Sequence, residues 1–437
     1  MTQDHLSFAR QFRFAAPYIR AHRGKTFVVG IPGEAVDHPN FQNLVHDLAL
    51  LGCLGIRLVL VHGARSRIEQ KLDDAGLQSH IHRDIRVTPE DQLNLICDAI
   101  HEVEQQIIKA FSRGMPNTPS FGMQNSVVSG NFLAARPVGV RDGVDYQYTG
   151  QVRMVHASRI DAALDSGAIV LVPTMGYSIT GEIYNLSLEE VTANLVSSLR
   201  ADKLISLCSK QRLNELHEVN ETVFSILQLE HAVAEQADPD ALVRAALHAV
   251  THGLGRAHIL DYETEGALLA ELFTPTGSGL MIVERDVEKV RTATLDDVGG
   301  ILEVIQPLES LGLLVKRDRE YLEQRIDQFR VIDIDGMVIA CAALFVYPEA
   351  ETGELACLAI HPDFRSSGRG SKLVHHLEHW AQSQGLKQIV TLTTEGLHWF
   401  VEQGFDEASV EDLPAGRREL YDSKRASKVY RKALKSL

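Results

Sequence analysis

Hydrophobic and polar residues in the first part of the chain follow a repeated strand and helix pattern. A helical pattern at 41–51 lies between apolar runs at 26–30 and 56–61, which are short enough to be buried strands. Comparable apolar runs follow at 126–129, 168–172, 203–208 and 258–260. Strands that alternate with helices predict a parallel or mixed sheet covered on both faces, and therefore an α/β fold.

A second α/β pattern occupies the end of the chain. Asp335-Gly336 lies between two apolar runs, and this dipeptide is a strong signal for a two-residue β-hairpin turn. The run 354–360 is apolar and ends at His361-Pro362, which predicts a buried strand. Apolar residues at helical spacing begin at Ser371 and predict a helix directly after that strand.

The start of the chain predicts a separate amphipathic helix. Apolar residues recur at helical spacing over 6–21, with arginines between them. This apolar face could pack on its own domain or on another subunit, and the pattern leaves both open. The predicted organisation is a helical segment 1–25, a domain 26–283, a linker 284–287 and a domain 288–437.

Length and charge exclude several classes of protein. A chain of 437 residues is too long for one core, which supports more than one domain. A net charge of −15 argues against non-specific binding to nucleic acid or to an anionic membrane. The first residues lack the apolar core of a signal peptide, and no run approaches the ~18 apolar residues of a membrane span. None of the five cysteines forms a C-x-x-C pair, so we expect no metal site and no disulfide framework, and a cytoplasmic location.

The segment between the strand at 354–360 and the following helix has the chemistry of an anion site. Its sequence, Arg365-Ser-Ser-Gly368-Arg-Gly370, is basic and contains glycine. A turn of this kind aims unpaired backbone N–H groups and the helix dipole at one point. Such a point suits a pyrophosphate.

This strand, turn and helix resemble the acetyl-CoA-binding motif of the Gcn5-related N-acetyltransferase (GNAT) family, over roughly residues 288–437. The resemblance implies a GNAT α/β domain with a mixed sheet, and acetyl-CoA as co-substrate without a metal. The backbone of Leu358 and Ile360 would bond the pantetheine. The pyrophosphate would be held by the side chain of Arg365 and by the backbone N–H groups of Gly368, Arg369, Gly370 and Ser371.

Other stretches resemble the bacterial N-acetylglutamate synthase family over essentially the whole chain. They include 314–322, 353–359 and 392–394. The resemblance implies acetylation of L-glutamate, the first step of arginine synthesis. Arg317 and Arg425 match positions that hold glutamate, and guanidinium groups bind carboxylates bidentately. Arg418 is a weaker candidate, with a surface salt bridge as its alternative role.

Three residues are candidates for the acetyl transfer itself. Glu354 begins the buried strand, where loss of hydration would make its carboxylate a stronger base, acting directly or through a water. The backbone N–H of Cys357 would stabilise the oxyanion. No activating histidine is evident for the Cys357 thiol, so we expect direct transfer without an acyl-enzyme. Thr393 could orient glutamate or donate to the leaving thiolate, and packing is its alternative role.

Residues 26–283 resemble the amino-acid kinase fold, and acetylglutamate kinase in particular, which implies an αβα sandwich. Val59-Leu-Val-His62-Gly63 matches the second strand and phosphate turn. The lysine and Gly-Gly of the first strand end are absent from Val29-Gly-Ile-Pro-Gly33, and Ala64-Arg65 replaces the later glycines. Phosphoryl transfer depends on positioned cations and backbone donors, so we expect no kinase activity.

The same resemblance implies a regulatory site for L-arginine as feedback inhibitor. The matching residues are Tyr18, His258, Glu271 and Gly277. Glu271 would suit a guanidinium, whereas His258 could equally be a core histidine. Tyr262 and Leu280 depart from the related motifs. The resemblance also suggests a homo-oligomer, a hexamer built as a ring of dimers.

Three other functions fit the sequence less well than acetylation of L-glutamate. An acetyltransferase for another amine, such as a protein N-terminus, fits poorly with the paired arginines. A non-catalytic arginine-binding regulator fits poorly with the intact turn and Glu354. An active N-acetylglutamate kinase would need the missing lysine.

Overall fold

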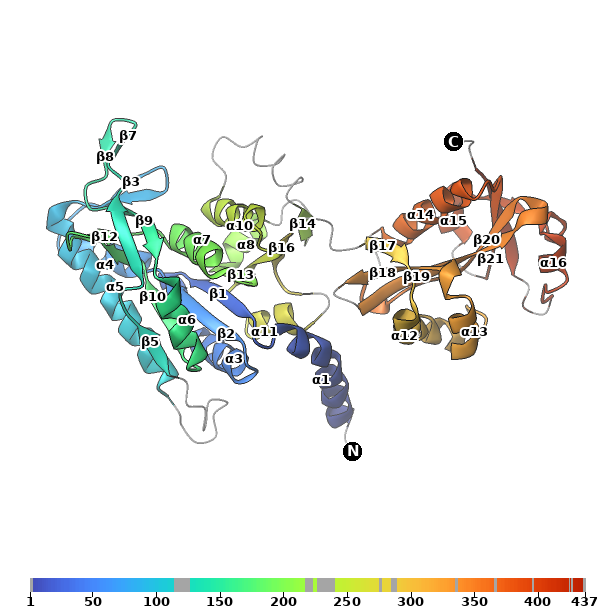
Figure 1. The fold of residues 1–437 in the computed structure, drawn as a ribbon, viewed down its shortest axis with the longest axis horizontal. Helices are drawn as coiled ribbons and strands as arrows, with labels where there is room; N and C mark the ends of the chain where they lie inside the picture. Colours follow the sequence, from blue (N-terminus) through green and yellow to red (C-terminus); the bar gives the residue numbers. More distant parts are fainter. Residues whose placement is uncertain are drawn as a thin grey trace. The chain divides into compact units, whose positions relative to one another are not determined.

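The computed structural model describes residues 3–113, 126–216, 223–225, 240–274, 277–283, 289–334, 337–364, 368–394, 397–423, 425 and 427–434 (Figure 1). The chain divides into two compact units, Met1–Arg285 and Asp286–Leu437. Residues 284–287 of the expected linker lie outside the described residues, so the bounds of the domains stay a prediction.

An eight-stranded sheet forms the centre of the first unit, in the order β14-β16-β15-β13-β1-β2-β10-β5. All of its pairs are parallel except β15 with β16. Its strands are β1 (Thr26–Ile31), β2 (Arg57–His62), β5 (Val127–Ser129), β10 (Ile169–Pro173), β13 (Lys203–Cys208), β14 (Val223–Ser225), β15 (Arg256–Asp261) and β16 (Leu280–Val283).

Helices cover both faces of this sheet, because alternate side chains of each strand enter different cores. Phe27 and Val29 of β1 join one core, and Val28 between them joins the other. The first core is closed by α2 (Gly33–Asp37), α3 (Phe41–Cys53), α4 (Arg65–Asp74), α5 (Glu90–Phe111) and α11 (Ala267–Phe273). The second is closed by α6 (Ala157–Asp165), α7 (Leu188–Leu199), α8 (Lys210–Leu216) and α10 (Ala241–Thr251). This is the predicted αβα sandwich.

Smaller sheets extend the first unit. β6 (Leu133–Pro137), β9 (Gly150–Val155), β11 (Met175–Tyr177) and β12 (Ile183–Asn185) form a four-stranded sheet in the order β12-β11-β6-β9. β3 (His80–His82) pairs with β4 (Ile85–Val87), and β7 (Val140–Arg141) pairs with β8 (Val144–Asp145).

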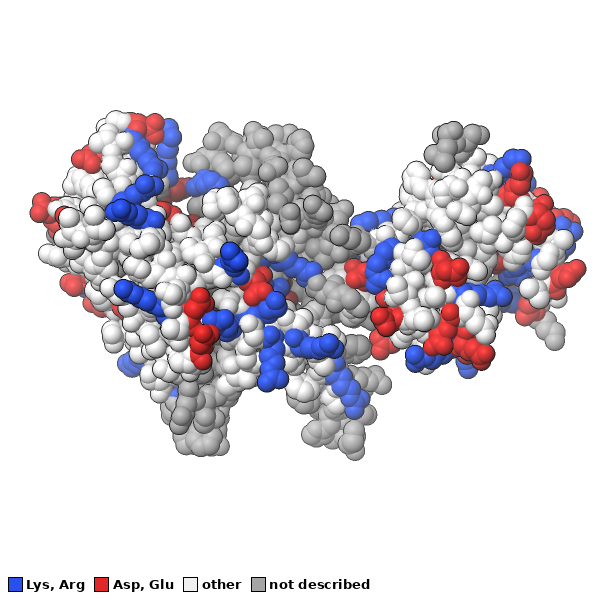
Figure 2. All heavy atoms as spheres, viewed as in Figure 1, with Lys and Arg blue, Asp and Glu red and all other residues white. Residues whose placement is uncertain are grey.

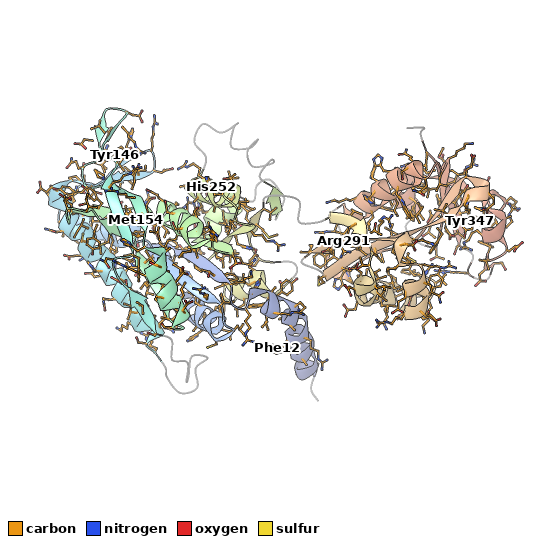
Figure 3. The ribbon with its side chains drawn as sticks, viewed as in Figure 1. Phe12, Tyr146, Met154, His252, Arg291 and Tyr347 are labelled. Carbon is orange, nitrogen blue, oxygen red and sulfur yellow. The ribbon has the colours of Figure 1, made fainter. Side chains whose placement is uncertain are left out.

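The N-terminal helix α1 (Gln3–His22) attaches to its own domain at its C-terminal end. His22 is buried, with its Nε2 2.9 Å from the carbonyl oxygen of Leu272 in α11. Phe12, further toward the start of the helix, is 60% exposed (Figure 3). The C-terminal end of α1 therefore packs against its own domain, whereas the Phe12 side chain is exposed.

A seven-stranded mixed sheet forms the second unit, in the order β17-β18-β19-β20-β21-β23-β22. Only β20 and β21 pair in parallel among its described strands. The strands are β17 (Lys289–Thr292), β18 (Phe329–Ile334), β19 (Met337–Tyr347), β20 (Thr352–Ile360), β21 (Gln388–Thr393), β22 (Asp406–Ala408) and β23 (Lys428–Ala433). This confirms the predicted mixed α/β class.

Helices cover both faces of this sheet as well. α12 (Val298–Ser310) and α13 (Arg319–Gln324) close one core, and α14 (Arg369–Ser383) and α15 (Leu397–Glu402) close the other. A single turn of helix, α16 (Ala415–Arg418), precedes the last strand.

The visible surface of each unit carries charges of both signs (Figure 2). Figure 2 shows Lys and Arg interspersed with Asp and Glu over the visible face of each unit. Within the described part of the chain, every helix is too short or too polar to cross a membrane. The same residues contain no group of three or more His, Cys, Asp or Glu side chains placed to hold a metal ion.

Candidate functional site

The sheet of the second unit opens at the middle of β20. β20 and β21 pair from Thr352 with Gln388 to Leu355 with Thr391, and their pairing ends there. On its other side, β20 shifts register against β19 at Cys341. Cys357 lies at this irregularity with φ at 53°, a left-handed conformation that is uncommon outside glycine. The bulge and the parted strands leave a strand edge whose backbone groups can meet a ligand.

The helix α14 begins beside this opening. Gly368 is its N-cap, with φ at 72°. A Cβ on Gly370 would lie 3.0 Å from the Trp399 ring and 3.4 Å from Ile360, so close packing requires glycine there. The first-turn N–H groups of this helix, which include those of Gly370 and Ser371, have no partners within the helix and can bind an anion. Arg365 lies outside the described residues.

The side chain of Arg369 has a structural role. It donates to the carbonyl oxygen of Phe364 at 2.9 Å, and its guanidinium lies 5.3 Å from the centre of the Phe364 ring. These contacts fix the end of the turn and leave the backbone N–H of Arg369 as its means of contacting a pyrophosphate.

Glu354 is buried at the start of β20, with 6% of its surface exposed. The sequence did not predict that an arginine compensates the loss of hydration of this carboxylate. Arg417 Nε lies 2.8 Å from both carboxylate oxygens, and the Tyr347 hydroxyl donates to Oε2 at 3.2 Å (Tyr347 is labelled in Figure 3). Burial and the nearby carboxylate raise the pKa of Tyr347 to about 12, so this hydroxyl keeps its proton and donates it.

The Cys357 thiol is unsuited to be a nucleophile. Burial raises the pKa of Cys357 to about 12, against the opposite effect of Arg317 and with a further rise from Glu354. Because the thiolate is the reactive form, the thiol is inert at neutral pH. This leaves the backbone N–H as the group that Cys357 can offer to the reaction.

Arg317 and Arg425 are brought to the same loop. Arg317 Nη1 donates to the carbonyl oxygen of Val315 at 2.9 Å, and its guanidinium lies 5.6 Å from the centre of the Tyr321 ring. Arg425 donates to the carbonyl oxygens of Gly312 and Leu313, although it is 112 residues from Leu313. Its buried Nε has no hydrogen-bond partner in the described part of the chain. Two guanidinium groups that both bond carbonyl oxygens of the loop 312–315 are candidates to bind a dicarboxylic substrate.

The two neighbouring arginines of α16, Arg417 and Arg418, make different contacts. Arg418 Nη2 donates to the carbonyl oxygens of Glu411 at 2.7 Å and Leu413 at 3.0 Å, so it braces a loop. The proposed surface salt bridge is replaced by these backbone bonds. Arg417, which the sequence did not single out, reaches Glu354 instead, and Tyr347 was missed as well. The only available signal was the Arg417-Arg418 pair itself, which does not reveal which residue turns inward.

Thr393 ends β21 beyond the point at which β20 leaves it. It pairs with Lys428 of β23 and is partly buried. Its position at the open edge of β21 is compatible with a substrate contact, and with packing.

The first unit has a cavity of about 500 Å³ over the carboxyl ends of its parallel strands. Residues that follow β1, β2, β10, β13 and β15 line it, including Gly33, Gly63, Thr174, Ser209 and Tyr262. In doubly wound sheets this edge is the usual place for a ligand. Arginines and carboxylates line the cavity, but none of its described lining residues is a lysine.

The residues of the expected arginine site lie around α11. His258 Nδ1 is 2.6 Å from Glu271 Oε1, and both side chains are buried. The backbone N–H groups of Ser278 and Gly279 donate to Glu271 Oε2 at 2.7 and 3.0 Å. Gly277 has φ at 63°, and a Cβ there would lie 2.6 Å from the same oxygen.

Hydrogen bonds and charge keep the Glu271 carboxylate ionised, and burial lowers the pKa of His258. Burial opposes the charge of Glu271, but the bonds from His258, Ser278 and Gly279 outweigh it and lower the pKa of Glu271 to about 2. Burial and the neighbouring Lys203 lower the pKa of His258. Lys203 Nζ lies 3.3 Å from His258 Nε2, so a neutral imidazole can accept from Lys203 and donate to Glu271.

Tyr18 reaches the same region from α1. Its ring centre is 6.4 Å from that of His22, which contacts Leu272 beside Glu271. The four predicted effector residues are therefore placed around one short helix.

Comparison with known proteins follows the same division. The amino acid kinase family model matches residues 25–261, and the acetyltransferase (GNAT) family model matches residues 302–405. An amino-acid acetyltransferase of Ectopseudomonas mendocina is 46% identical over 433 residues, covering 97% of this chain and 98% of its own. One from Azotobacter vinelandii is 45% identical, covering 98% and 99%.

A solved structure also matches nearly the full length. N-acetylglutamate synthase from Neisseria gonorrhoeae complexed with coenzyme A and L-arginine is 35% identical, with a TM-score of 0.82, over 98% of this chain and 99% of that one. The same enzyme complexed with coenzyme A and N-acetyl-glutamate gives a TM-score of 0.60 over the same shares. These similarities confirm the resemblance of both domains that the sequence motifs indicated.

Proposed function

The chain belongs to the amino-acid acetyltransferase family, and on that premise we propose that it transfers the acetyl group of acetyl-CoA to the amine of L-glutamate. The products are N-acetyl-L-glutamate and CoA. The observation that carries this proposal is the buried carboxylate of Glu354 at the point where β20 and β21 part. One base, one exposed strand edge and one helix N-terminus there are the parts that acetyl transfer needs.

Acetyl-CoA would bind along the open edge of β20. The backbone of Leu358 and Ile360 would bond its pantetheine, and the N–H groups from Gly368 to Ser371 would hold its pyrophosphate. Arg365 would assist as a cation. The thioester would then lie near Cys357, whose N–H would stabilise the oxyanion.

Glutamate would be held by its carboxylates on Arg317 and Arg425. Its ammonium would lose a proton to Glu354, directly or through a water. The amine nitrogen would then bond to the thioester carbon, and the carbon–sulfur bond would break. The leaving CoA thiolate would take up a proton, with Thr393 as a possible donor. The pKa of Cys357, raised to about 12 by burial, supports direct transfer to the amine over an acyl-enzyme.

The first unit would regulate this reaction by binding L-arginine. The Neisseria gonorrhoeae enzyme binds L-arginine, and we extend this to Tyr18, His258, Glu271 and Gly277. Glu271 Oε1 accepts one bond in the structure and has a lone pair left for a guanidinium. The cavity of this unit has no lysine among its described lining residues, which supports the absence of kinase activity.

The assembly and location belong to the same proposal. The exposed Phe12 of α1 supports a homo-oligomer in which this helix meets another subunit, and a hexamer built as a ring of dimers is the state we expect. Five cysteines without a disulfide support a reducing, cytoplasmic location.

The test of the reaction is direct. Purified protein is incubated with acetyl-CoA and each of several amino acids, and thiol release and the mass of the product are measured. N-acetylglutamate should form with L-glutamate, and L-arginine should slow it. Thiol release with another amine, but none with glutamate, would contradict the substrate assignment.

A further inference from the structure

The carboxylate of Glu354 is held by two side chains, neither of which belongs to its own strand. Arg417 Nε lies 2.8 Å from each oxygen, and Tyr347 donates to Oε2. The side chains of Arg417 and Glu354 are 18% and 7% exposed, so water screens this pair little. Because Arg417 bonds both oxygens, a substrate ammonium would have to compete with this guanidinium for the carboxylate.

The guanidinium of Arg417 is only partly used. Apart from Glu354, it donates through Nη1 to the carbonyl oxygen of Leu420 at 3.3 Å. Nη2 has no hydrogen bond within the part of the chain that the structure describes. The fork of an arginine offers five N–H donors, so Arg417 has donors left for a second carboxylate.

Arg417 also lies close to the groups that would receive the substrate. Tyr347, which shares the Glu354 carboxylate with Arg417, packs against the same hydrophobic core as Tyr321. The guanidinium of Arg317 lies 5.6 Å from the centre of the Tyr321 ring. Besides burial, the charges of Arg317 and Glu354 both affect the pKa of the Cys357 thiol, which Arg317 lowers and Glu354 raises. A dicarboxylic substrate on Arg317 would therefore bring negative charge next to the Arg417–Glu354 pair.

We propose that Arg417 is a substrate-sensing positioning residue, which restrains Glu354 until a carboxylate of the substrate draws its guanidinium away. This rests on the proposed acetylation of glutamate. Exchange of one carboxylate for another keeps the guanidinium of Arg417 paired, whereas the buried carboxylate of Glu354 loses its cation. A buried carboxylate without a cation accepts a proton more readily than one in an ion pair. Glu354 is then held by Tyr347 alone and is free to accept a proton from the substrate ammonium.

The restraint protects acetyl-CoA. A free base beside the thioester would take a proton from water, whose oxygen would bond to the acetyl carbon as the carbon–sulfur bond breaks. Acetate and CoA would result, with the CoA thiolate taking up the remaining proton. Holding Glu354 until a dicarboxylate arrives suppresses this hydrolysis.

Glutarate tests the exchange in the unmodified enzyme. It has the two carboxylates of glutamate and no amine, so it can displace Arg417 but cannot accept an acetyl group. We expect glutarate to raise CoA release without amine by about tenfold, well within the ~10²–10⁴-fold effect of a positioned base. Glutaramide, its uncharged analogue, should have no effect. Equal CoA release with glutarate, glutaramide and neither compound would overturn the proposal.

The variant Arg417→Gln tests the same step from the enzyme side. Hydrolysis without amine should already be high and insensitive to glutarate, and Arg417→Gln/Glu354→Gln should return it to the background level. Arg431→Gln is the matched control, because Arg431 forms an ion pair with Asp412 at 3.3 Å on the surface. Hydrolysis that stays low in Arg417→Gln, or that survives the double substitution, would contradict the role of Arg417.

Removing Arg417 leaves a buried carboxylate without its cation, and the variant could fold poorly. Arg417→Lys keeps the charge but loses the fork, and should show the same rise in hydrolysis to a smaller extent. CoA binding and thermal unfolding of each variant establish that it is folded. A Lys variant that is folded and has no rise in hydrolysis would also contradict the proposal.

The pH profile separates this role from simple packing. Loss of the cation beside Glu354 should move the acid limb of the kcat/KM profile for glutamate to higher pH, whereas a packing defect would lower kcat/KM at every pH. If the unmodified enzyme acetylates glutamate but none of these effects is seen, only the restraint is wrong. If it does not acetylate glutamate, the proposed function itself is wrong.

Discussion

Two buried carboxylates, Glu271 in the first unit and Glu354 in the second, differ in what holds them. Glu271 is bonded to His258 and to the backbone N–H groups of Ser278 and Gly279. Among the described residues, the carboxylate of Glu354 is bonded only to the side chains of Arg417 and Tyr347. Backbone donors cannot leave without moving the chain, whereas side-chain donors can change rotamer.

The difference indicates two kinds of buried charge. Glu271 is a fixed anion that organises the loop after α11, and its pKa of about 2 leaves it ionised throughout the physiological range, despite its burial. Glu354 is held by side chains that can exchange, which suits the role of general base that we propose for it. The nature of the donors therefore separates the proposed arginine-binding site at Glu271 from the proposed proton-transfer site at Glu354.

The largest expected effect is that of Glu354→Gln. Loss of a general base should lower kcat by ~10²–10⁴-fold while acetyl-CoA binding stays close to normal. Thiol release under saturating substrates and calorimetric binding of CoA measure the two quantities. Glu407→Gln, at a surface pair with Lys428, is the control. Unchanged turnover in Glu354→Gln would show that Glu354 is not the base. The proposed difference in role between Glu354 and Glu271 would then be wrong.

The substitution Glu271→Gln should act on stability. The pKa of Glu271 falls from 4.5 to about 2 on folding, because its hydrogen bonds outweigh burial. Its contribution, roughly 3 kcal/mol, is therefore present above pH 4.5 and lost as the pH falls toward 2. Urea unfolding of the wild type and the variant should differ strongly at pH 7 and converge in acid.

The control for this comparison is Glu215→Gln, since Glu215 is exposed and bonded to Gln211. It should shift the unfolding midpoint little at either pH. A difference between wild type and Glu271→Gln that is equal at pH 7 and pH 3 would show that the ionised form of Glu271 is not the source of the stability.

The variants Arg317→Gln and Arg425→Gln separate the binding of glutamate from proton transfer at Glu354. Each should raise KM for glutamate by about 10- to 100-fold, since hydrogen bonds to charged groups contribute about 1.5–3 kcal/mol. The KM for acetyl-CoA should change little. Steady-state kinetics with each substrate varied in turn measure both, with Arg431→Gln as the control. A loss confined to kcat would place these arginines in the chemistry and not in substrate binding.

The smallest effect is expected for Cys357→Ala. The proposed oxyanion donor is a backbone N–H, and burial keeps the thiol protonated with a pKa of about 12. Turnover should stay within about threefold of wild type, with a modest loss of stability from the deleted sulfur. A loss above about 100-fold, or an acetylated Cys357 found by mass spectrometry, would instead indicate an acyl-enzyme.

Much of the architecture could be predicted because its signals are local. The apolar run that became β20, the glycine turn and the helix α14 are each specified by residues close together in the chain. The Arg-x-x-Gly-x-Gly spacing predicted an anion site, because closely spaced backbone N–H groups suit an anion, and the family resemblance implied acetyl-CoA as its ligand. The same is true of the strand and helix alternation in the first unit.

The candidate site was predicted less completely. The side chains of Arg317 and Arg425 both bond carbonyl oxygens of the loop 312–315, and their joint role in substrate binding stays a prediction. The partner of Glu354 was not expected, since Arg417 is 63 residues away and adjacent to an arginine of equal chemistry. Which of the two turns toward β20 depends on how α16 packs.

The two α/β units could be predicted from the residues alone, because periodicity and turn chemistry depend on residues only a few positions apart. The anion-binding turn was predicted in the same way and stays a prediction. The tertiary structure was needed to show that backbone N–H groups bond Glu271, whereas only the side chains of Arg417 and Tyr347, among the described residues, bond the carboxylate of Glu354. That distinction arises where distant segments meet, at α11 with the loop at 277–279 and at β20 with α16. Contacts of this kind follow from packing geometry, which no local pattern of residues specifies.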